Sequence, residues 1–155
     1  MNRRAITLSA ASLLTAVGAR MGRAAAPDTT QGHKLVIHVG GGDPALMATA
    51  LHNAANAIDG YSERHQAIQI EIVVNGPGYA MVREGVSPVA DLVAETLRQH
   101  PGLVIAACQI SRRGIAHAEG KTPADIKELP GITDIPSGIV RLTDLQEQGY
   151  SYVRV

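Results

Sequence analysis

The chain has 155 residues, of which 45% are hydrophobic, so its size and composition predict one globular domain with a substantial core. With 14 basic and 14 acidic side chains the formal net charge is zero, which gives no electrostatic reason to expect nucleic acid or an anionic membrane surface as a partner. Phe and Trp are absent and Tyr occurs only four times, which argues against a stacking surface for single-stranded nucleic acid.

The first segment, residues 1–26, is typical of an export signal. Arg3 and Arg4 precede a run of small apolar residues that is too short for a stable membrane span. The arginine pair also resembles a twin-arginine signal, so Sec and twin-arginine export both stay open. We therefore expect a mature domain over residues 27–155 that is periplasmic or secreted and does not contact a membrane. An N-terminal helix that remains on the protein is the alternative.

Strand and helix signals alternate along the rest of the chain. Short runs of apolar and β-branched residues predict strands, and apolar residues at helical spacing after capping residues predict helices. In chain order we expect a strand at 34–39, a helix from Asp43 and Pro44 to Gly60, a strand at 68–74, a break at 75–78, a helix at 88–100, a strand at 103–107, a short helical turn after Cys108, a capped helix start at Thr122, a strand at 132–135, a helix from Ser137 to Gln148 and an edge strand at 150–155.

This alternation predicts an α/β fold built from βαβ units, with a mostly parallel sheet that helices cover on both faces. In such sheets, ligands and reactive groups gather beyond the carboxyl ends of the strands. Three segments, 40–43, 75–78 and 108–113, are therefore expected to converge at that edge of the sheet.

Cys108 is the only cysteine, so it cannot form a disulfide within the chain. It follows a strand at an expected helix start, where backbone N–H groups favour thiolate over thiol. Arg112 would return near the sulfur after one helical turn, and with Arg113 it would lower the thiol pKa further. The alternatives are a packed, inert thiol, because free cysteine is often buried as a small hydrophobe, and a thiol that pairs with another chain.

Four residues near the same strand ends are candidate substrate contacts: Asn75, Gly76, Asp43 and Asn53. Asn75 either supplies a hydrogen bond to the site or only shapes the turn with Gly76. Asn53 shares a helix face with Asn56, and this pair either reaches the strand-end loops or satisfies backbone groups at a helix–sheet contact.

Neither a metal nor a cofactor is expected. The six histidines show no paired ligand spacing. The pattern GxGxxA over residues 40–45 formally matches a dinucleotide fingerprint, but the next strand ends at Asn75 rather than at the acid that would bind the ribose. Pro44 also removes a backbone donor, so a tight strand–helix turn is the favoured interpretation.

Several short motifs together resemble the DsrE/DsrF-like family, in particular an exported and largely uncharacterised branch. The stretch AACQISRRGI (106–115) is similar to the family's cysteine loop, in which a cysteine at a strand end precedes an Arg-Gly pair. The resemblance extends over residues 33–155 through HKLVIHV (33–39), DP (43–44), LHNAAN (51–56), VNGPG (74–78), PSG (136–138) and LQEQGYSY (145–152).

The resemblance implies a three-layer α/β/α sandwich around a mostly parallel sheet of about five strands, and it implies homo- or hetero-oligomers. In the better understood branches the cysteine carries sulfane sulfur as a persulfide and passes it to a partner protein. Carried onto this chain, Cys108 is the sulfur acceptor, and Arg112 and Arg113 stabilise its anion. The expected function is thus a sulfur carrier or sulfurtransferase, and the alternative is a non-catalytic oligomeric binding or accessory module with an inert, buried Cys108.

Overall fold

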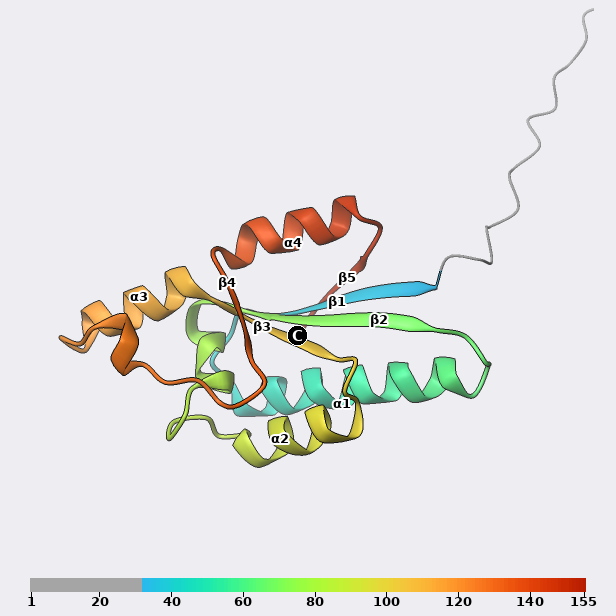
Figure 1. Cartoon of the computed structure of the whole chain (residues 1–155), viewed down its shortest axis with the longest axis horizontal. Coiled ribbons are helices and arrows are strands. Elements are labelled where there is room, and N and C mark those ends of the chain that lie inside the picture. The colour runs from blue at the N-terminus through green and yellow to red at the C-terminus, as the bar shows by residue number, and fades with distance from the viewer. Residues whose placement is uncertain (1–31) are drawn as a thin grey trace, which may run out of the picture.

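The computed structural model describes residues 32–155, so the expected export signal at 1–26 lies outside the described residues. Strands and helices alternate along this part of the chain (Figure 1). The elements, with η for a 3-10 helix, are β1 (His33–Val39), α1 (Pro44–Ser62), β2 (Ile68–Val74), η1 (Gly76–Val82), α2 (Ala90–Gln99), β3 (Val104–Cys108), α3 (Gln109–Ala118), η2 (Pro123–Asp125), β4 (Thr133–Ile135), α4 (Gly138–Glu147) and β5 (Ser151–Arg154). Within residues 32–155, no helix is both long enough and apolar enough to cross a membrane.

The five strands form one sheet in the order β4-β3-β2-β1-β5, and every neighbouring pair is parallel. Helices α1 and α2 lie on one face of the sheet and α4 lies on the other, which makes three layers (Figure 1). Helix α3 projects beyond the carboxyl ends of the strands and covers neither face. The predicted α/β fold with a parallel sheet of about five strands is therefore confirmed.

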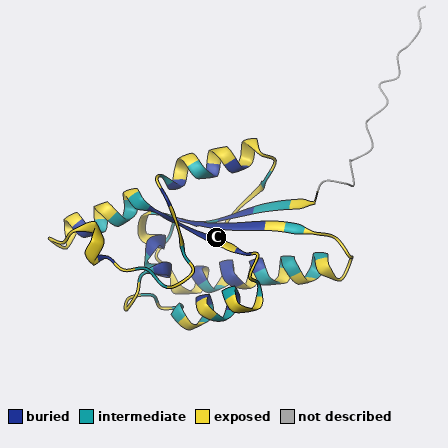
Figure 2. Cartoon of the chain, viewed as in Figure 1, coloured by how far each residue is buried: buried dark blue, intermediate teal, exposed yellow. Residues whose placement is uncertain are grey.

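Alternate residues of each central strand fill two separate cores, because successive side chains of a strand point to opposite faces. Ile37 and Ile72 belong to the larger cluster, against α1 and α2, while Val36 and Val73 belong to the smaller cluster, against α4. Figure 2 shows the buried residues along the strands and on the inner sides of the helices.

An ion pair between a half-buried arginine and a buried carboxylate holds α4 to the sheet. Glu71 of β2 is only 4% exposed and lies on the face that α4 covers. The Arg141 guanidinium donates to both of its carboxylate oxygens, at 2.8 and 2.6 Å. A buried carboxylate is tolerated when it is paired in this way, so the Glu71–Arg141 pair determines where α4 lies on the smaller core.

The structure corrects the expected helix at Thr122, which is only the 3-10 turn η2. Thr122 and Asp125 do form the capping box that predicts a helix start. The chain then becomes extended at Ile126, because the next residues pair with the segment after η1: Glu84 donates to the Lys127 carbonyl oxygen and Leu129 donates to that of Val82. Backbone pairing with a distant segment therefore ends the helix after one turn.

Two other segments are more helical than expected. Residues 75–78 were predicted only to break the second strand, but Gly76 starts the 3-10 helix η1. The segment after Cys108 is a helix of ten residues rather than a short turn. Both helices begin at the carboxyl edge of the sheet, so they help to build the candidate site.

Candidate functional site

The three segments expected to converge beyond the strands do lie together. Asn75 donates its backbone N–H to the Val39 carbonyl oxygen at 3.2 Å, and Gly76 donates its own to the Ser111 hydroxyl oxygen at 2.8 Å. Gly78 lies so close to β1 that a Cβ would collide with the Val39 carbonyl oxygen, so only glycine fits there. The ends of β1, β2 and β3 are thereby locked side by side.

Cys108 lies at the centre of this edge. It is the last residue of β3 and the N-cap of α3, and it is 4% exposed. Its Sγ accepts a hydrogen bond from the backbone N–H of Gly138, at 3.2 Å. Gly138 is the first residue of α4, so the N-termini of two helices, α3 and α4, meet at one sulfur.

This arrangement favours the thiolate. Burial raises the pKa of Cys108, but the backbone N–H groups of Gly138, Ser111 and Ile110 and the Ser111 hydroxyl lower it. The net result is a thiol pKa below its ordinary value of 9.0. N–H groups that point out of a helix N-terminus stabilise an anion, and here they come from both helices.

Sequence reasoning missed the contribution of Gly138 and Ser111. The strand at 132–135 and the helix start at Ser137 were both expected, and both are present. What was missing was the pairing of β4 directly with β3, which places Ile135 opposite Cys108 and brings the next residues over the sulfur.

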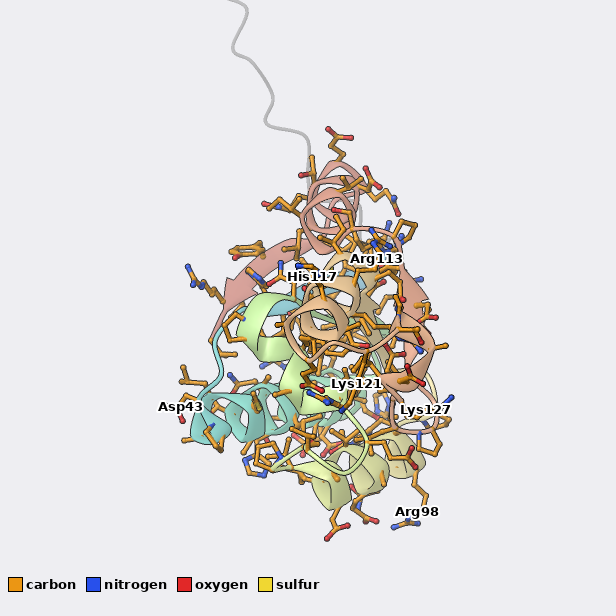
Figure 3. The ribbon with its side chains drawn as sticks, turned by 90° about the vertical axis from the view of Figure 1, so that its left-hand side faces the viewer. Asp43, Arg98, Arg113, His117, Lys121 and Lys127 are labelled. Carbon is orange, nitrogen blue, oxygen red and sulfur yellow. The ribbon has the colours of Figure 1, made fainter. Side chains whose placement is uncertain are left out.

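The expected role of Arg112 at the thiolate needs correction. Its guanidinium Nε donates to the Pro123 carbonyl oxygen at 2.8 Å, and its Nη1 lies 3.6 Å from Asp134 Oδ2 and 4.0 Å from Glu128 Oε1. The guanidinium thus lies with two carboxylates, which attract it more strongly than a single sulfur does. Arg113 is exposed and, within residues 32–155, makes no side-chain hydrogen bond or ion pair; Figure 3 shows it at the surface.

Arg112 belongs to a polar cluster beside the site, formed by Tyr79, Gln109, Arg112, Glu128 and Asp134. The buried Tyr79 hydroxyl donates to the Glu128 carboxylate, and burial raises the pKa of both Tyr79 and Glu128. Gln109 donates to Asp134 Oδ1 at 2.5 Å and accepts from Arg112 at 3.3 Å. This cluster anchors the first turn of α3, immediately after Cys108.

Two of the predicted substrate contacts do not reach the sulfur. The Asp43 side chain caps α1 by accepting from the Ala45 N–H at 2.8 Å, and Figure 3 shows it at the surface, far from Arg113. Asn53 is exposed, as is Asn56, because Met47, Ala50, Leu51 and Ala54 are the residues of α1 that face the core. Within residues 32–155, neither asparagine side chain makes a hydrogen bond to the strand-end loops or to the sheet in this structure.

Asn75 is the predicted contact that lies beside the thiol. A Cβ added at Gly138 would lie 3.2 Å from Asn75 Nδ2 and 3.3 Å from Cys108 Cβ, so the amide and the cysteine flank the same point. Asn75 Oδ1 is 3.0 Å from His38 Nε2. His38 was considered only as a metal ligand in the sequence. Within residues 32–155, no three His, Cys, Asp or Glu side chains are grouped so that they could hold a metal ion.

A pocket of about 480 Å³ opens between η1 and α3, next to the site. Gly76 and Ser111, which contact each other, line the side nearest to Cys108. Val86 and Ile115 contribute apolar surface, and Arg83 lines it while paired with Glu119. The pocket is therefore mainly apolar and is separated from the sulfur by Ser111.

No protein-family model matches the chain, and no curated protein matches it. Solved structures do match, among them the following two. One is a protein of unknown function, MTH1491 from Methanobacterium thermoautotrophicum, with 23% identity and a TM-score of 0.64, and the other is the ychN protein of E. coli, with 15% identity and a TM-score of 0.60. Each match covers 79% of this chain and 99% of the other. Both proteins have the DsrE/DsrF-like fold.

The described domain has a DsrE/DsrF-like fold. At these identities the two similarities establish the fold alone. Any activity of the DsrE-like domain must therefore be argued from the geometry around Cys108.

Proposed function

We propose that this DsrE-like domain is a sulfur carrier that holds sulfane sulfur as a persulfide on Cys108. The observation that supports it most directly is the hydrogen bond from the Gly138 N–H to Cys108 Sγ, at the meeting point of two helix N-termini. A thiolate is the nucleophile in sulfur exchange, and this environment favours the thiolate at lower pH than an ordinary thiol allows.

The proposed reaction has two exchange steps. Cys108 first loses its proton to solvent, and the thiolate attacks the outer sulfur of a donor persulfide. The bond between the donor's two sulfurs breaks, the donor leaves as a thiolate, and Cys108 holds the outer sulfur as Cys–S–S⁻. In the second step an acceptor thiolate attacks that outer sulfur and Cys108 leaves as the thiolate. Each step exchanges one S–S bond for another, so no external oxidant or reductant is consumed.

The choice between the sulfur-carrier proposal and the binding-module alternative depends on whether a sulfur donor can reach the Cys108 sulfur. At 4% exposure, Cys108 is also compatible with a packed, inert thiol in a non-catalytic oligomeric binding or accessory module. The pocket beside Ser111 gives a small donor a place next to the thiol, separated from it by one residue.

The proposal includes the expected setting of the protein. We propose that the domain acts after export, in the periplasm or outside the cell, as a homo-oligomer that receives sulfur from a donor and passes it to an acceptor protein. The zero net charge is compatible with such partners and favours neither nucleic acid nor a membrane surface.

The test is the intact mass of the native protein before and after incubation with inorganic polysulfide. We expect the wild type to gain one sulfur atom that a reducing agent removes, and the Cys108→Ser variant to gain none. A second measurement follows alkylation of the native thiol by iodoacetamide. If the wild type neither gains sulfur nor reacts with iodoacetamide until it is unfolded, Cys108 is an inert core residue and the binding-module alternative is correct.

A further inference from the structure

Side chains from two strands and from the residue that follows a third strand form a hydrogen-bonded chain that ends beside Cys108. The Tyr152 hydroxyl oxygen is 2.7 Å from His38 Nδ1, and His38 Nε2 is 3.0 Å from Asn75 Oδ1. The chain begins at β5, where Tyr152 is 41% exposed, and continues through the half-buried His38 of β1 to Asn75 at the end of β2. We call these three residues the Tyr–His–Asn chain.

With the Asn75 carboxamide in the orientation that the structure gives it, the hydrogen-bonding rules leave one assignment for the protons of this chain when the His38 ring is neutral. Asn75 Oδ1 can only accept, so His38 Nε2 must carry the hydrogen and donate. In the neutral ring, Nδ1 is then an acceptor, and the Tyr152 hydroxyl donates to it. The imidazole therefore holds the Asn75 carboxamide in one orientation, and the tyrosine fixes the tautomer that does so.

That orientation leaves the Nδ2 group of the carboxamide on the side of Gly138, next to Cys108. Asn75 Nδ2 lies 3.2 Å from the position that a Cβ of Gly138 would take, and Cys108 Cβ lies 3.3 Å from the same position. Within residues 32–155 the Nδ2 group has no hydrogen-bond partner. Every fully buried side-chain nitrogen or oxygen there has a partner, so Nδ2 is not fully buried. Its N–H groups are therefore available for an acceptor that arrives at the site.

We infer that the Asn75 amide binds the outer, negatively charged sulfur of a Cys108 persulfide, and that His38 and Tyr152 are positioning residues that aim this amide. The inference rests on the proposed sulfur-carrier function and adds the place where the outer sulfur is held. Backbone N–H groups of Gly138, Ile110 and Ser111 already surround Sγ itself. On this inference the outer sulfur, one bond beyond Sγ, accepts from Asn75 Nδ2.

The first measurement tests the geometry without any sulfur chemistry. NMR of nitrogen-labelled protein, recorded at a pH where the His38 ring is neutral, should show hydrogen on Nε2 and none on Nδ1. Tyr152→Phe should weaken this preference, whereas the matched control Tyr150→Phe should not, because the Tyr150 hydroxyl bonds to Gln69 instead. Hydrogen on Nδ1 in the wild type would mean that the chain does not orient Asn75, and the inference would fall.

The second measurement is the equilibrium of sulfur exchange between Cys108 and a glutathione persulfide–glutathione couple, followed by intact mass. Loss of a hydrogen bond to a charged group should lower the exchange constant about tenfold in Asn75→Ala. Tyr152→Phe acts only through the amide and should lower it about threefold, and Tyr150→Phe should leave it unchanged. His38→Gln, which keeps a donor toward Asn75, should retain more of the constant than His38→Leu.

A structural role alone would not give this pattern. The thiol pKa, measured from the pH dependence of alkylation, should stay the same in Asn75→Ala and Tyr152→Phe, because backbone N–H groups and Ser111 set it. Sulfur uptake by the wild type with an unchanged exchange constant in Asn75→Ala would overturn this inference alone. Failure of the wild type to take up sulfur would overturn the proposed function, and the role of Asn75 with it.

Discussion

The sulfur of Cys108 accepts a hydrogen bond from Gly138 and lies among the N–H groups of Ile110 and Ser111. These donors belong to the backbone or to a short side chain, so folding fixes them in place before any substrate arrives. Arginine side chains near a cysteine must instead be ordered at a cost in entropy. At the residue scale, the candidate site is thus preorganised by the main chain. Arg112 is not needed at the sulfur and instead contacts Glu128 in the polar cluster.

The Ser111 hydroxyl gives a direct test of this account. Replacing it in Ser111→Ala removes one of the donors that lower the pKa of Cys108. One hydrogen bond of this kind should raise the thiol pKa by about half to one pH unit. The measurement is the rate of alkylation against pH in the native state. Ser137→Ala is the control, because the Ser137 side chain makes no capping bond at α4, and an unchanged pKa in Ser111→Ala would contradict the account.

The lowered pKa of Cys108 also predicts a pH dependence of stability. Between the folded pKa and the ordinary value of 9.0, the folded protein releases its thiol proton while the unfolded chain keeps it. The free energy of unfolding should therefore rise with pH across this interval, by at most about 1.4 kcal/mol per pH unit, and this gain should be lost as pH falls through the folded pKa.

Cys108→Ser isolates this effect, because serine does not titrate in the range. Urea denaturation of both proteins at a series of pH values should give a difference in unfolding free energy that is constant at low pH and then grows in favour of the wild type. A difference that shrinks as pH rises toward 9.0 would mean that the folded state disfavours the thiolate.

Helix α3 is the least covered element of the site. Among its residues only Ala116 is buried, and it projects past the end of the sheet (Figure 1). Its attachment therefore depends on a few polar contacts of its first turn, those of Gln109 and Arg112 with Asp134, Glu128 and the Pro123 carbonyl oxygen. At the scale of elements, the polar cluster keeps the N-terminus of α3 on Cys108.

Adjacent arginines allow this to be tested. Arg112→Ala should lower the free energy of unfolding by about 1–3 kcal/mol, because it removes a cationic partner of the mostly buried Glu128 carboxylate and the donor to the Pro123 carbonyl oxygen. Arg113→Ala should change it by less than about 0.5 kcal/mol, since that side chain is exposed. Urea denaturation measures both, and hydrogen exchange should show faster opening of α3 only in Arg112→Ala. A thiol pKa that rises in Arg112→Ala would restore the role that the sequence suggested for this residue.

The elements themselves were largely predictable, and the exceptions have physical reasons. Apolar runs bounded by glycine, proline and capping residues are local signals, so all five strands and the long helix after Asp43 could be found in the sequence. The helix expected at Thr122 stops after one turn because the residues that follow Asp125 pair with the segment after η1. Local patterns contain no information on such pairing.

Within the site, Cys108 and Asn75 could be predicted, and their partners could not. Both lie at strand ends, and in parallel sheets such ends meet at one edge. Gly138, Ser111 and His38 lie within stretches that resemble the family, but nothing in those stretches indicates a contribution to the site. Gly138 and Ser111 reach the sulfur, and His38 reaches Asn75, because β3 lies between β4 and β2, with β1 next to β2. The alternation of strands and helices does not determine that order. The role expected of Arg112 could not be corrected from the sequence, because Glu128 and Asp134, which bind its guanidinium, are close to it in space but not in the sequence.

The whole domain is held by two cores of unequal size on opposite faces of one sheet. Helices α1 and α2 close the larger core, and the ten-residue α4 closes the smaller one. Because the strands contribute to both cores, loss of either should weaken the whole sheet and unfolding should be cooperative. Cys108 and the Glu71–Arg141 pair lie on the sheet face with the smaller core. The geometry of the candidate site therefore depends on how α4 packs against that face.

Two leucines of α1 test the importance of the larger core. Leu51 is fully buried, and Leu51→Ala should lower the free energy of unfolding by about 2–5 kcal/mol. Leu46 lies on the same helix but is 39% exposed, so Leu46→Ala should cost less than about 1 kcal/mol. Thermal unfolding followed by circular dichroism should give one transition for each protein. Similar losses for the two variants would contradict the division of α1 into a core face and a solvent face.

The position of β5 has a consequence for the making of the protein. β5 pairs with β1, and Tyr152 bonds to His38, although the two residues are 114 positions apart in the sequence. During synthesis β1 leaves the ribosome first of the five strands and β5 leaves it last. The edge of β1 that pairs with β5 therefore remains without a partner strand until the rest of the sheet has been translated. The hydrogen bond from Tyr152 to His38 likewise cannot form until the last of the described strands has been synthesised, whereas the pairing of β1 with β2 needs only the first half of the chain.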